Sequence, residues 1–181
     1  MLSPLTRSDL SEAQIKTCHQ IKVNSDGDND HPDTNPADRL AVAWYKIYAD
    51  DISIAESGRF YDVPGDRDER KHYFMPSIDA NKNGDFVIGF SGSGIYDYVS
   101  AFYAGRRNGG APSQPVRFFA GKDWCDDNGD GVHLMRWGDY SHTSLDPDGL
   151  TIWSIQEYAE TRYLTGQRNA YGTRIVAVTA Y

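Results

Sequence analysis

Acidic and amide side chains alternate in one short stretch of the sequence at the spacing of a calcium loop. Asp126, Asn128 and Asp130 precede Gly131, which matches positions 1, 3, 5 and 6 of an EF-hand loop. Oxygen ligands at alternate positions of a tight turn suit a hard cation. We therefore predict a Ca²⁺ site at Asp126, Asn128 and Asp130, with Asp139 as a candidate extra ligand. The alternative is a plain loop, because no glutamate stands at position 12.

Two further stretches have part of the same spacing. Asp79, Asn81 and Asn83 precede Gly84, and here we favour a hairpin turn over residues 81–84, because glycine readily adopts a positive φ. The alternation that starts at Asp26 has a histidine where the glycine belongs, and it falls in a polar stretch with two prolines. That composition is typical of a loop.

A charge, a large ring and a carboxylate stand together in the run Arg136-Trp137-Gly138-Asp139-Tyr140. An aromatic ring offers a surface on which a sugar stacks, and the polar neighbours can bond its hydroxyl groups. The run is therefore a candidate glycan-binding element. In the alternative interpretation, Trp137 and Tyr140 pack inside the fold and Asp139 caps a turn.

Several other functions are disfavoured. The five histidines are scattered, and the sequence contains no H-E-x-x-H, G-x-S-x-G, P-loop or Rossmann pattern. A net charge of −8 repels a phosphate backbone, so we expect no nucleic-acid partner. No apolar run approaches the roughly 20 residues that span a bilayer. Cys18 and Cys125 are compatible with two thiols or with one long-range disulfide.

The composition predicts an all-β fold made of many short strands. The chain has 12 Tyr, 7 Phe and 4 Trp, which favour strands, and 17 Gly and 8 Pro, which favour turns. For residues 1–16 we expect a polar segment with one or two helical turns, since Ser11 and Gln14 have the spacing of a capping box. After a loop at 24–38, the patterns predict strands at residues 39–48, 52–61, 75–80, 86–91, 99–105, 116–120, 140–146, 151–158 and 174–180.

A weak internal repeat favours a β-propeller over a sandwich or barrel. Ser77-Ile78-Asp79 and Ser144-Leu145-Asp146 are each followed by a turn with glycine and an aromatic-rich strand. We predict an unplaced segment at 1–38 and a partial propeller at 39–181. It would comprise the outer half of a blade at 39–61, a blade at 75–120 and a blade at 140–181.

This partial propeller would leave sheet faces and edges uncovered. A propeller closes with at least four blades, whereas this length provides about two to two and a half. Open faces promote association, so we expect a homo-oligomer that completes the ring or an aggregation-prone fragment. Alternatively, residues 17–23 fold back as the missing outer strand.

The order of several motifs resembles the C-terminal half of bacterial sialidase-like (BNR-type) β-propeller proteins. These motifs are the run from Met75 to Asp85, Gly89-Phe-Ser-Gly-Ser93, Tyr103-Ala-Gly-Arg106, Arg136-Trp-Gly-Asp-Tyr-Ser141, the strand from Trp153 to Tyr158, and Gly172-Thr-Arg174. The resemblance covers about residues 39–181. It implies a secreted or surface protein whose signal peptide precedes this segment, because the first residues contain no apolar signal core.

The resemblance also suggests which residues would bind a ligand. Sialidases hold a carboxylate with three arginines, and Arg106, Arg136 and Arg174 each fall near a strand end. The alternative is that each arginine pairs with a neighbouring blade or a strand-end carbonyl. Glu157 and Tyr158 provide a glutamate and a tyrosine, but adjacent strand residues point to opposite faces.

An imperfect Asp box, from Ser144 to Trp153, is expected to stabilise a turn. The candidate ligand-binding residues are therefore Arg106, Arg136, Trp137, Asp139, Tyr140 and Arg174. We expect a non-catalytic propeller module that binds glycan or protein. The alternative functions are a sialidase-type glycoside hydrolase fragment whose full site needs further blades, and a purely structural fragment.

Overall fold

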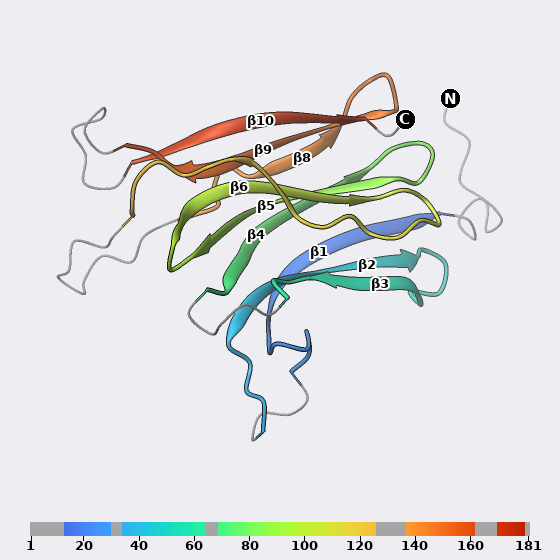
Figure 1. The fold of residues 1–181 in the computed structure, drawn as a ribbon. Helices are drawn as coiled ribbons and strands as arrows, with labels where there is room; N and C mark the ends of the chain where they lie inside the picture. Colours follow the sequence, from blue (N-terminus) through green and yellow to red (C-terminus); the bar gives the residue numbers. More distant parts are fainter. Residues whose placement is uncertain (1–12, 30–33, 64–68, 126–136, 162–169, 180–181) are drawn as a thin grey trace.

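The computed structural model describes residues 13–29, 34–63, 69–125, 137–161 and 170–179 (Figure 1). These residues form ten strands and no helix, which confirms the predicted all-β class. The strands are β1 (Gln14–Val23), β2 (Arg39–Tyr48), β3 (Ile54–Phe60), β4 (Lys71–Ala80), β5 (Phe86–Gly94), β6 (Asp97–Arg106), β7 (Val116–Phe119), β8 (His142–Leu145), β9 (Thr151–Ala159) and β10 (Tyr171–Thr179).

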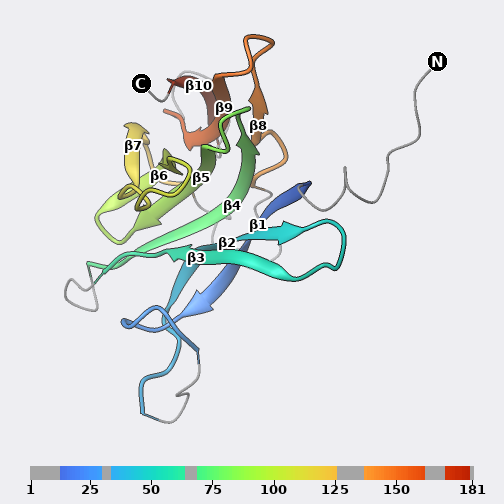
Figure 2. The same cartoon turned by 90° about the vertical axis from the view of Figure 1, so that its right-hand side faces the viewer.

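The strands form three antiparallel sheets in which neighbours in sequence are neighbours in space. The first sheet has the order β1-β2-β3, the second β4-β5-β6-β7 and the third β10-β9-β8. Figure 2 shows the sheets stacked one after another, with β1, β4 and β8 nearest the middle and β7 at the outside.

Strands β4 and β8 run in the same direction, whereas β1 runs opposite to β4. The hydroxyl oxygens of Ser77 and Thr143 lie 2.7 Å apart, and two residues further along both strands the amide of Leu145 donates to Asp79. The amide of Met75, midway along β4, donates to the side chain of Gln20 on β1 at 3.4 Å, and Lys16, nearer the start of β1, interacts electrostatically with Asp79 at the end of β4. The first strands of the second and third sheets are therefore parallel, whereas the first sheet begins with a strand that runs in the opposite direction.

Strand β1 corrects the prediction for the N-terminal region. Its residues from Gln14 to Val23 pair with β2 over its full length, so Gln14 belongs to a strand and not to a helical capping box. The expected strand at 17–23 exists, but it pairs with β2 in the first sheet and does not complete the third. Polar residues on alternate positions obscured this strand in the sequence, because its exposed face resembles a loop.

The interface between the first and second sheets is an aromatic core. Trp44 packs on Phe86 with ring centroids 4.8 Å apart, and Phe60 of β3 lies 6.5 Å from Phe90 of β5 in a stacked arrangement. Gly58 on β3 leaves room for the Trp44 ring, since a Cβ at this position would meet the indole. Aromatic pairs of this kind stabilise a fold beyond the effect of their buried area.

The interface between the second and third sheets is instead a seam of small polar groups. Thr143 on β8 contacts the hydroxyl of Ser77 on β4 and the hydroxyl of Ser154 on β9 at 3.0 Å. The fully buried Gln156 donates to Ser154 at 3.1 Å and to Ser77 at 3.3 Å. Gly89 on β5 makes this approach possible, because a Cβ there would overlap Ser154 and Gln156.

The turn between β4 and β5 confirms the predicted hairpin. The side-chain oxygen of Asn81 accepts the amides of Asn83 and Asp85, and its amide group donates to the Asp85 carboxylate at 2.9 Å. Gly84 has a φ of +83° and permits the reversal. This turn also holds the third sheet, because Asn81 donates to the carbonyl of Leu150.

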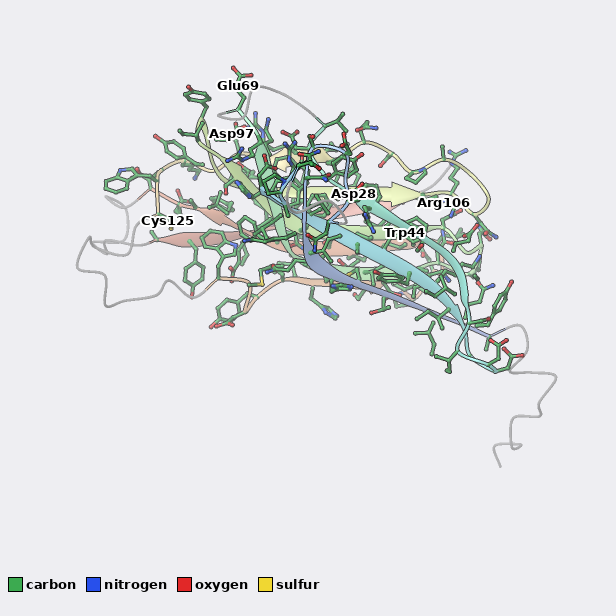
Figure 3. All side chains as sticks on the ribbon, turned by 90° about the horizontal axis from the view of Figure 1, so that it is seen from below. Asp28, Trp44, Glu69, Asp97, Arg106 and Cys125 are labelled. Carbon is green, nitrogen blue, oxygen red and sulfur yellow. The ribbon has the colours of Figure 1, made fainter. Side chains whose placement is uncertain are left out.

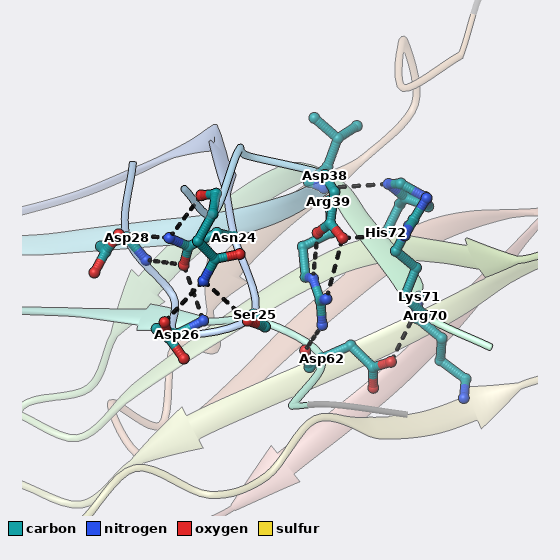
Figure 4. Close-up of polar contacts among 12 residues, drawn as sticks. Asn24, Ser25, Asp26, Asp28, Asp38, Arg39, Asp62, Arg70, Lys71 and His72 are labelled. Carbon is teal, nitrogen blue, oxygen red and sulfur yellow. Dashed lines mark hydrogen bonds and ion pairs between the residues drawn. The ribbon is translucent and has the colours of Figure 1, made fainter. Parts of the chain in front are cut away.

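The loop that follows β1 uses the same chemistry. The side-chain oxygen of the buried Asn24 accepts the amides of Asp26 and Asp28, and its amide group donates to the Asp28 carboxylate at 2.7 Å (Figure 4). Gly27 has a φ of +82°. The stretch from Asp26 to residue 29, the last described residue before residue 34, therefore forms a closed turn.

A group of polar contacts around the buried Arg39 joins the loop to the start of β4. Arg39, only 3% exposed, donates to the Asp38 carboxylate at 2.9 Å and to the carbonyl of Asp62 (Figure 4). Asp38 also binds Arg70 at 3.0 Å, and the amide of Leu40 donates to the ring of His72. Buried charge is tolerated here because each group has partners.

The two cysteines are not joined by a disulfide. Cys18 packs against the aromatic core, and burial raises the pKa of its thiol to about 12. Among the described residues, no helix is long and apolar enough to cross a membrane.

A charged cluster fastens the second sheet to the third at one end. Lys122 donates from its backbone amide to the carbonyl of Ala159 at 2.8 Å and from its ammonium group to Glu160 at 2.9 Å. The hydroxyl of Tyr158 donates to the same carboxylate at 2.6 Å. The ammonium of Lys122 and the hydroxyl of Tyr158 hold the pKa of Glu160 at about 2.

Replacing Gly89 with alanine should destabilise the fold by about 1–3 kcal/mol, because overpacking displaces the buried polar seam. Chemical denaturation measures this change. The matched variant Gly89→Ala with Ser154→Ala removes one overlapping hydroxyl and should lose less than the sum of the single changes. Strict additivity of the two losses would show that Gly89 and Ser154 do not share one packing constraint.

Acid should weaken the native protein more than its Glu160→Gln variant. The pKa of Glu160 in the folded state lies below the roughly 4.3 of a free glutamate, so its charge stabilises the fold above that pH. This contribution fades as the pH falls toward about 2. Melting temperatures at about pH 6 and pH 3 test this, with the exposed Glu69→Gln as control. Equal acid sensitivity of Glu160→Gln and the unmodified chain would contradict it.

Candidate functional site

A buried carboxylate positions the segment that holds the predicted sugar-binding residues. Glu157 on β9 is 2% exposed, and its two oxygens accept the backbone amides of Gly138 at 2.7 Å and Tyr140 at 3.2 Å. Hydrogen bonds to a charged acceptor are stronger than neutral ones. The backbone of residues 138–140 is therefore fixed by a single side chain from the neighbouring strand.

Trp137 anchors the same segment to the second sheet. Its indole N–H donates to the hydroxyl of Ser91 on β5 at 3.0 Å, and that hydroxyl donates to the carbonyl of Glu157 at 3.3 Å. Gly138 has a φ of +96° and lies against the side chain of Met75. The indole of Trp137 is thus partly buried and engaged with the fold, as in the packing alternative.

Tyr140 and Asp139 point outward from this fixed segment. The Tyr140 ring is 55% exposed and stacks on Tyr171 of β10, with centroids 5.9 Å apart and planes inclined by 18°. Tyr171 is itself 49% exposed. The pKa of Tyr171 is raised, first by Tyr140 and then by partial desolvation, which indicates that the two hydroxyl groups are close. The result is an exposed aromatic pair beside the exposed Asp139.

The two described arginines of the predicted triad occupy different sheet interfaces. Arg106 forms a two-pronged ion pair with Glu56 of β3 at 2.8 and 3.2 Å, and its guanidinium lies 5.6 Å from the Trp44 ring. This pairing lowers the pKa of Glu56. The guanidinium of Arg174 lies 4.2 Å from the Phe119 ring on the other face of the second sheet.

This arrangement matches the alternative in which each arginine contacts a neighbouring sheet. Figure 3 places Arg106 beside Trp44, away from the end that carries Asp97 and Cys125. Arg136 lies outside the described residues, so its position in the predicted triad stays a prediction.

The imperfect Asp box is a turn whose polar groups bond to one another. The carboxylate of Asp146 accepts the indole N–H of Trp153 at 2.7 Å and the amide of Asp148. Asp148 in turn accepts the amides of Leu150 and Thr151, which lower the pKa of its carboxyl group. The box therefore closes the hairpin between β8 and β9, as expected from the sequence.

The predicted calcium ligands Asp126, Asn128 and Asp130 lie outside the described residues. Within the described ranges, no three His, Cys, Asp or Glu side chains gather as a group that could hold a metal. The calcium site therefore stays a prediction.

Glu157 and Tyr158 point to opposite faces of β9, as predicted. Glu157 faces residues 138–140, while Tyr158 packs on Phe119 with centroids 4.3 Å apart. Tyr171 is the functional candidate that sequence patterns do not reveal. Its only sequence signal is its position before the Gly172-Thr-Arg174 run, and its proximity to Tyr140 arises from pairing of β10 with β9.

No protein-family model matches the chain, and no curated protein matches it either. The sialidase-like resemblance therefore stays a prediction that rests on the motifs themselves.

The Glu157→Gln variant should be destabilised by about 1–3 kcal/mol, because an amide NH₂ would replace an oxygen that accepts a backbone N–H. The pair of Tyr140 and Tyr171 should separate as the segment loosens, which near-UV circular dichroism detects alongside chemical denaturation. Glu69→Gln changes an exposed glutamate and serves as the matched control. Unchanged stability and an unchanged aromatic signal would mean that Glu157 does not fix the segment.

Proposed function

We propose that the three sheets are consecutive blades of a β-propeller and that the chain is a non-catalytic module that binds glycan. The single observation that supports the binding function best is the exposed Tyr140–Tyr171 pair beside Asp139, held on a rigid support by Glu157. The extracellular or surface location in this proposal rests on the resemblance to sialidase-like propellers.

Strand direction supports the propeller interpretation. The sheet from β4 to β7 has the four-stranded antiparallel order of a blade, and β8 to β10 repeat its first three strands with β8 parallel to β4. Strand β1 runs opposite to β4, as expected if β1 to β3 are the outer three strands of the preceding blade.

The outward face of the third sheet carries exposed apolar side chains in the described part of the chain. Trp153 is 42% exposed and Ile175 is 62% exposed, and both border a hollow of about 230 Å³ on this face. In the proposed propeller a further blade, or a second copy of the chain, packs there, because a blade normally buries both faces.

The geometry of the aromatic pair favours sugar. Tyrosine offers a large, stiff contact surface with a polar tip, so it binds at a small cost in conformational entropy. Asp139 adds an acceptor for hydroxyl groups, and the net charge of −8 disfavours phosphate-rich partners.

Binding without catalysis is favoured because a glycosidase needs carboxyl groups that are accessible to its substrate. A glycosidase uses two carboxyl groups about 5–10 Å apart around the scissile bond. Glu157 is buried, and both of its oxygens already accept backbone amides. Arg106, which would bind a substrate carboxylate, is paired with Glu56.

Tyr140→Ala and Tyr171→Ala should each weaken glycan binding by about tenfold or more, since aromatic anchors dominate such contacts. An array of purified neutral and sialylated glycans identifies the probe, and calorimetry with the best binder measures the dissociation constant. Tyr48→Ala, which removes a tyrosine 38% exposed on β2, is the matched control.

Absence of binding to every glycan on the array, or unchanged affinity in both variants, would contradict the proposed site. Hydrolysis of a fluorogenic sialoside by the purified chain would instead favour the hydrolase alternative.

A further inference from the structure

A polar cleft of about 510 Å³ opens between the β5–β6 connection and the segment after β7. It is lined by residues 93–99 on one side and by Trp124 and Cys125 on the other. Three aromatic side chains at this cleft are strongly exposed: Tyr96 at 77%, Tyr98 at 48% and Trp124 at 47%. Exposed rings gathered around one hollow mark a candidate ligand-binding site.

The first wall of the cleft is held rigid by ion pairs. Asp97, at the start of β6, binds Arg117 of β7 at 2.7 Å and Lys71 of β4 at 3.3 Å. It therefore ties the hairpin connection to two other strands. Tyr96 and Tyr98 flank this residue, so the rings stand on a fixed support.

The second wall is anchored by contacts of the two residues at its start. The amide of Gly121 donates to the hydroxyl of Ser100 at 2.9 Å, and a Cβ at Gly121 would meet the backbone of Val99. The next residue, Lys122, bonds to Ala159 and Glu160 of the third sheet. Trp124 therefore follows closely after two anchored residues.

The cleft lies at the same end of the molecule as the Tyr140–Tyr171 pair. Tyr171 is paired with Ala159, to which the Lys122 amide donates, and the thiol of Cys125 lies 4.0 Å from the carbonyl of Ala170. The second wall of the cleft therefore adjoins the residue immediately before Tyr171. The two aromatic surfaces are neighbours on one end of the fold.

We infer that this cleft is a second carbohydrate-binding subsite, built by Tyr96, Tyr98 and Trp124, and that the ligand is an oligosaccharide. Sugar rings stack on the aromatic faces, while Ser93 and the backbone around the cleft bond hydroxyl groups. The inference deepens the proposed glycan-binding function, but it rests on different residues from those of the Tyr140–Tyr171 pair.

The test uses the full chain and a panel of purified oligosaccharides of one to six sugars, made up of cello-, xylo- and chito-oligosaccharides and sialyllactose. Calorimetry measures affinity. Tryptophan fluorescence reports contact at the cleft through the part of the signal that is lost in Trp124→Phe, since Trp124 is exposed, Trp44 is buried, and Trp137 and Trp153 lie away from the cleft lining. We expect affinity to rise with chain length and the fluorescence change to fall in Trp124→Phe. Tyr96→Ala and Trp124→Ala should each weaken binding of the longest ligand by about tenfold.

The variants separate the two sites. One outcome would overturn the cleft and leave the proposed site intact. In that outcome Tyr140→Ala loses binding, whereas Tyr96→Ala and Trp124→Ala keep full affinity and an unchanged fluorescence response. The reverse pattern would support the cleft and overturn the Tyr140–Tyr171 site. Equal affinity for short and long oligosaccharides, or no binding at all, would overturn the inference. Thermal unfolding of each variant confirms that it is folded.

Discussion

The close approach of the second and third sheets at Gly89 is the constraint on which the rest of this structure depends. Because Gly89 has no side chain, Ser154 and Gln156 of β9 approach the backbone of β5 closely, and their polar groups bond to Thr143 of β8 and Ser77 of β4. Buried hydrogen bonds of this kind are directional, so they specify one relative position of the two sheets. That position places Ser91 within reach of Trp137 and of the backbone at Glu157.

The two sheet interfaces stabilise the fold in different ways. The aromatic interface around Trp44 and Phe90 provides bulk hydrophobic stabilisation, which tolerates small shifts of one sheet over another. The polar seam with the third sheet provides directional hydrogen bonds, which do not tolerate such shifts. The Glu157 carboxylate lies beside this polar seam, which fixes the position of the third sheet relative to the second. The backbone of residues 138–140, which Glu157 holds, is positioned in the same way. The exposed rings of Tyr140 and Tyr171 are thereby held in one position, as the proposed glycan binding requires.

One end of the fold collects exposed aromatic side chains from separate parts of the sequence. The connection after β5, the segment after β7 and the strands β9 and β10 all meet there, and the Lys122–Glu160 ion pair joins them. The opposite end of the second and third sheets holds the closed turns at Asn81 and Asp146, whose polar groups bond within the turns. This asymmetry is the main reason for placing ligand binding at the aromatic end.

The sequence by itself determined the all-β class, nine of the ten strands to within a few residues, the hairpin turn at 81–84 and the turn role of Asp146. These features depend on local composition and spacing, which a single sequence reveals. The strand at 14–23 was expected only in part, at 17–23 and in another sheet, because its exposed polar positions resemble a loop. Only the tertiary structure decided that Arg106 pairs with Glu56, that Glu157 holds residues 138–140, and that Tyr171 joins Tyr140. Each of these contacts joins different strands or sheets, and their proximity arises from sheet pairing and stacking, which local patterns do not encode.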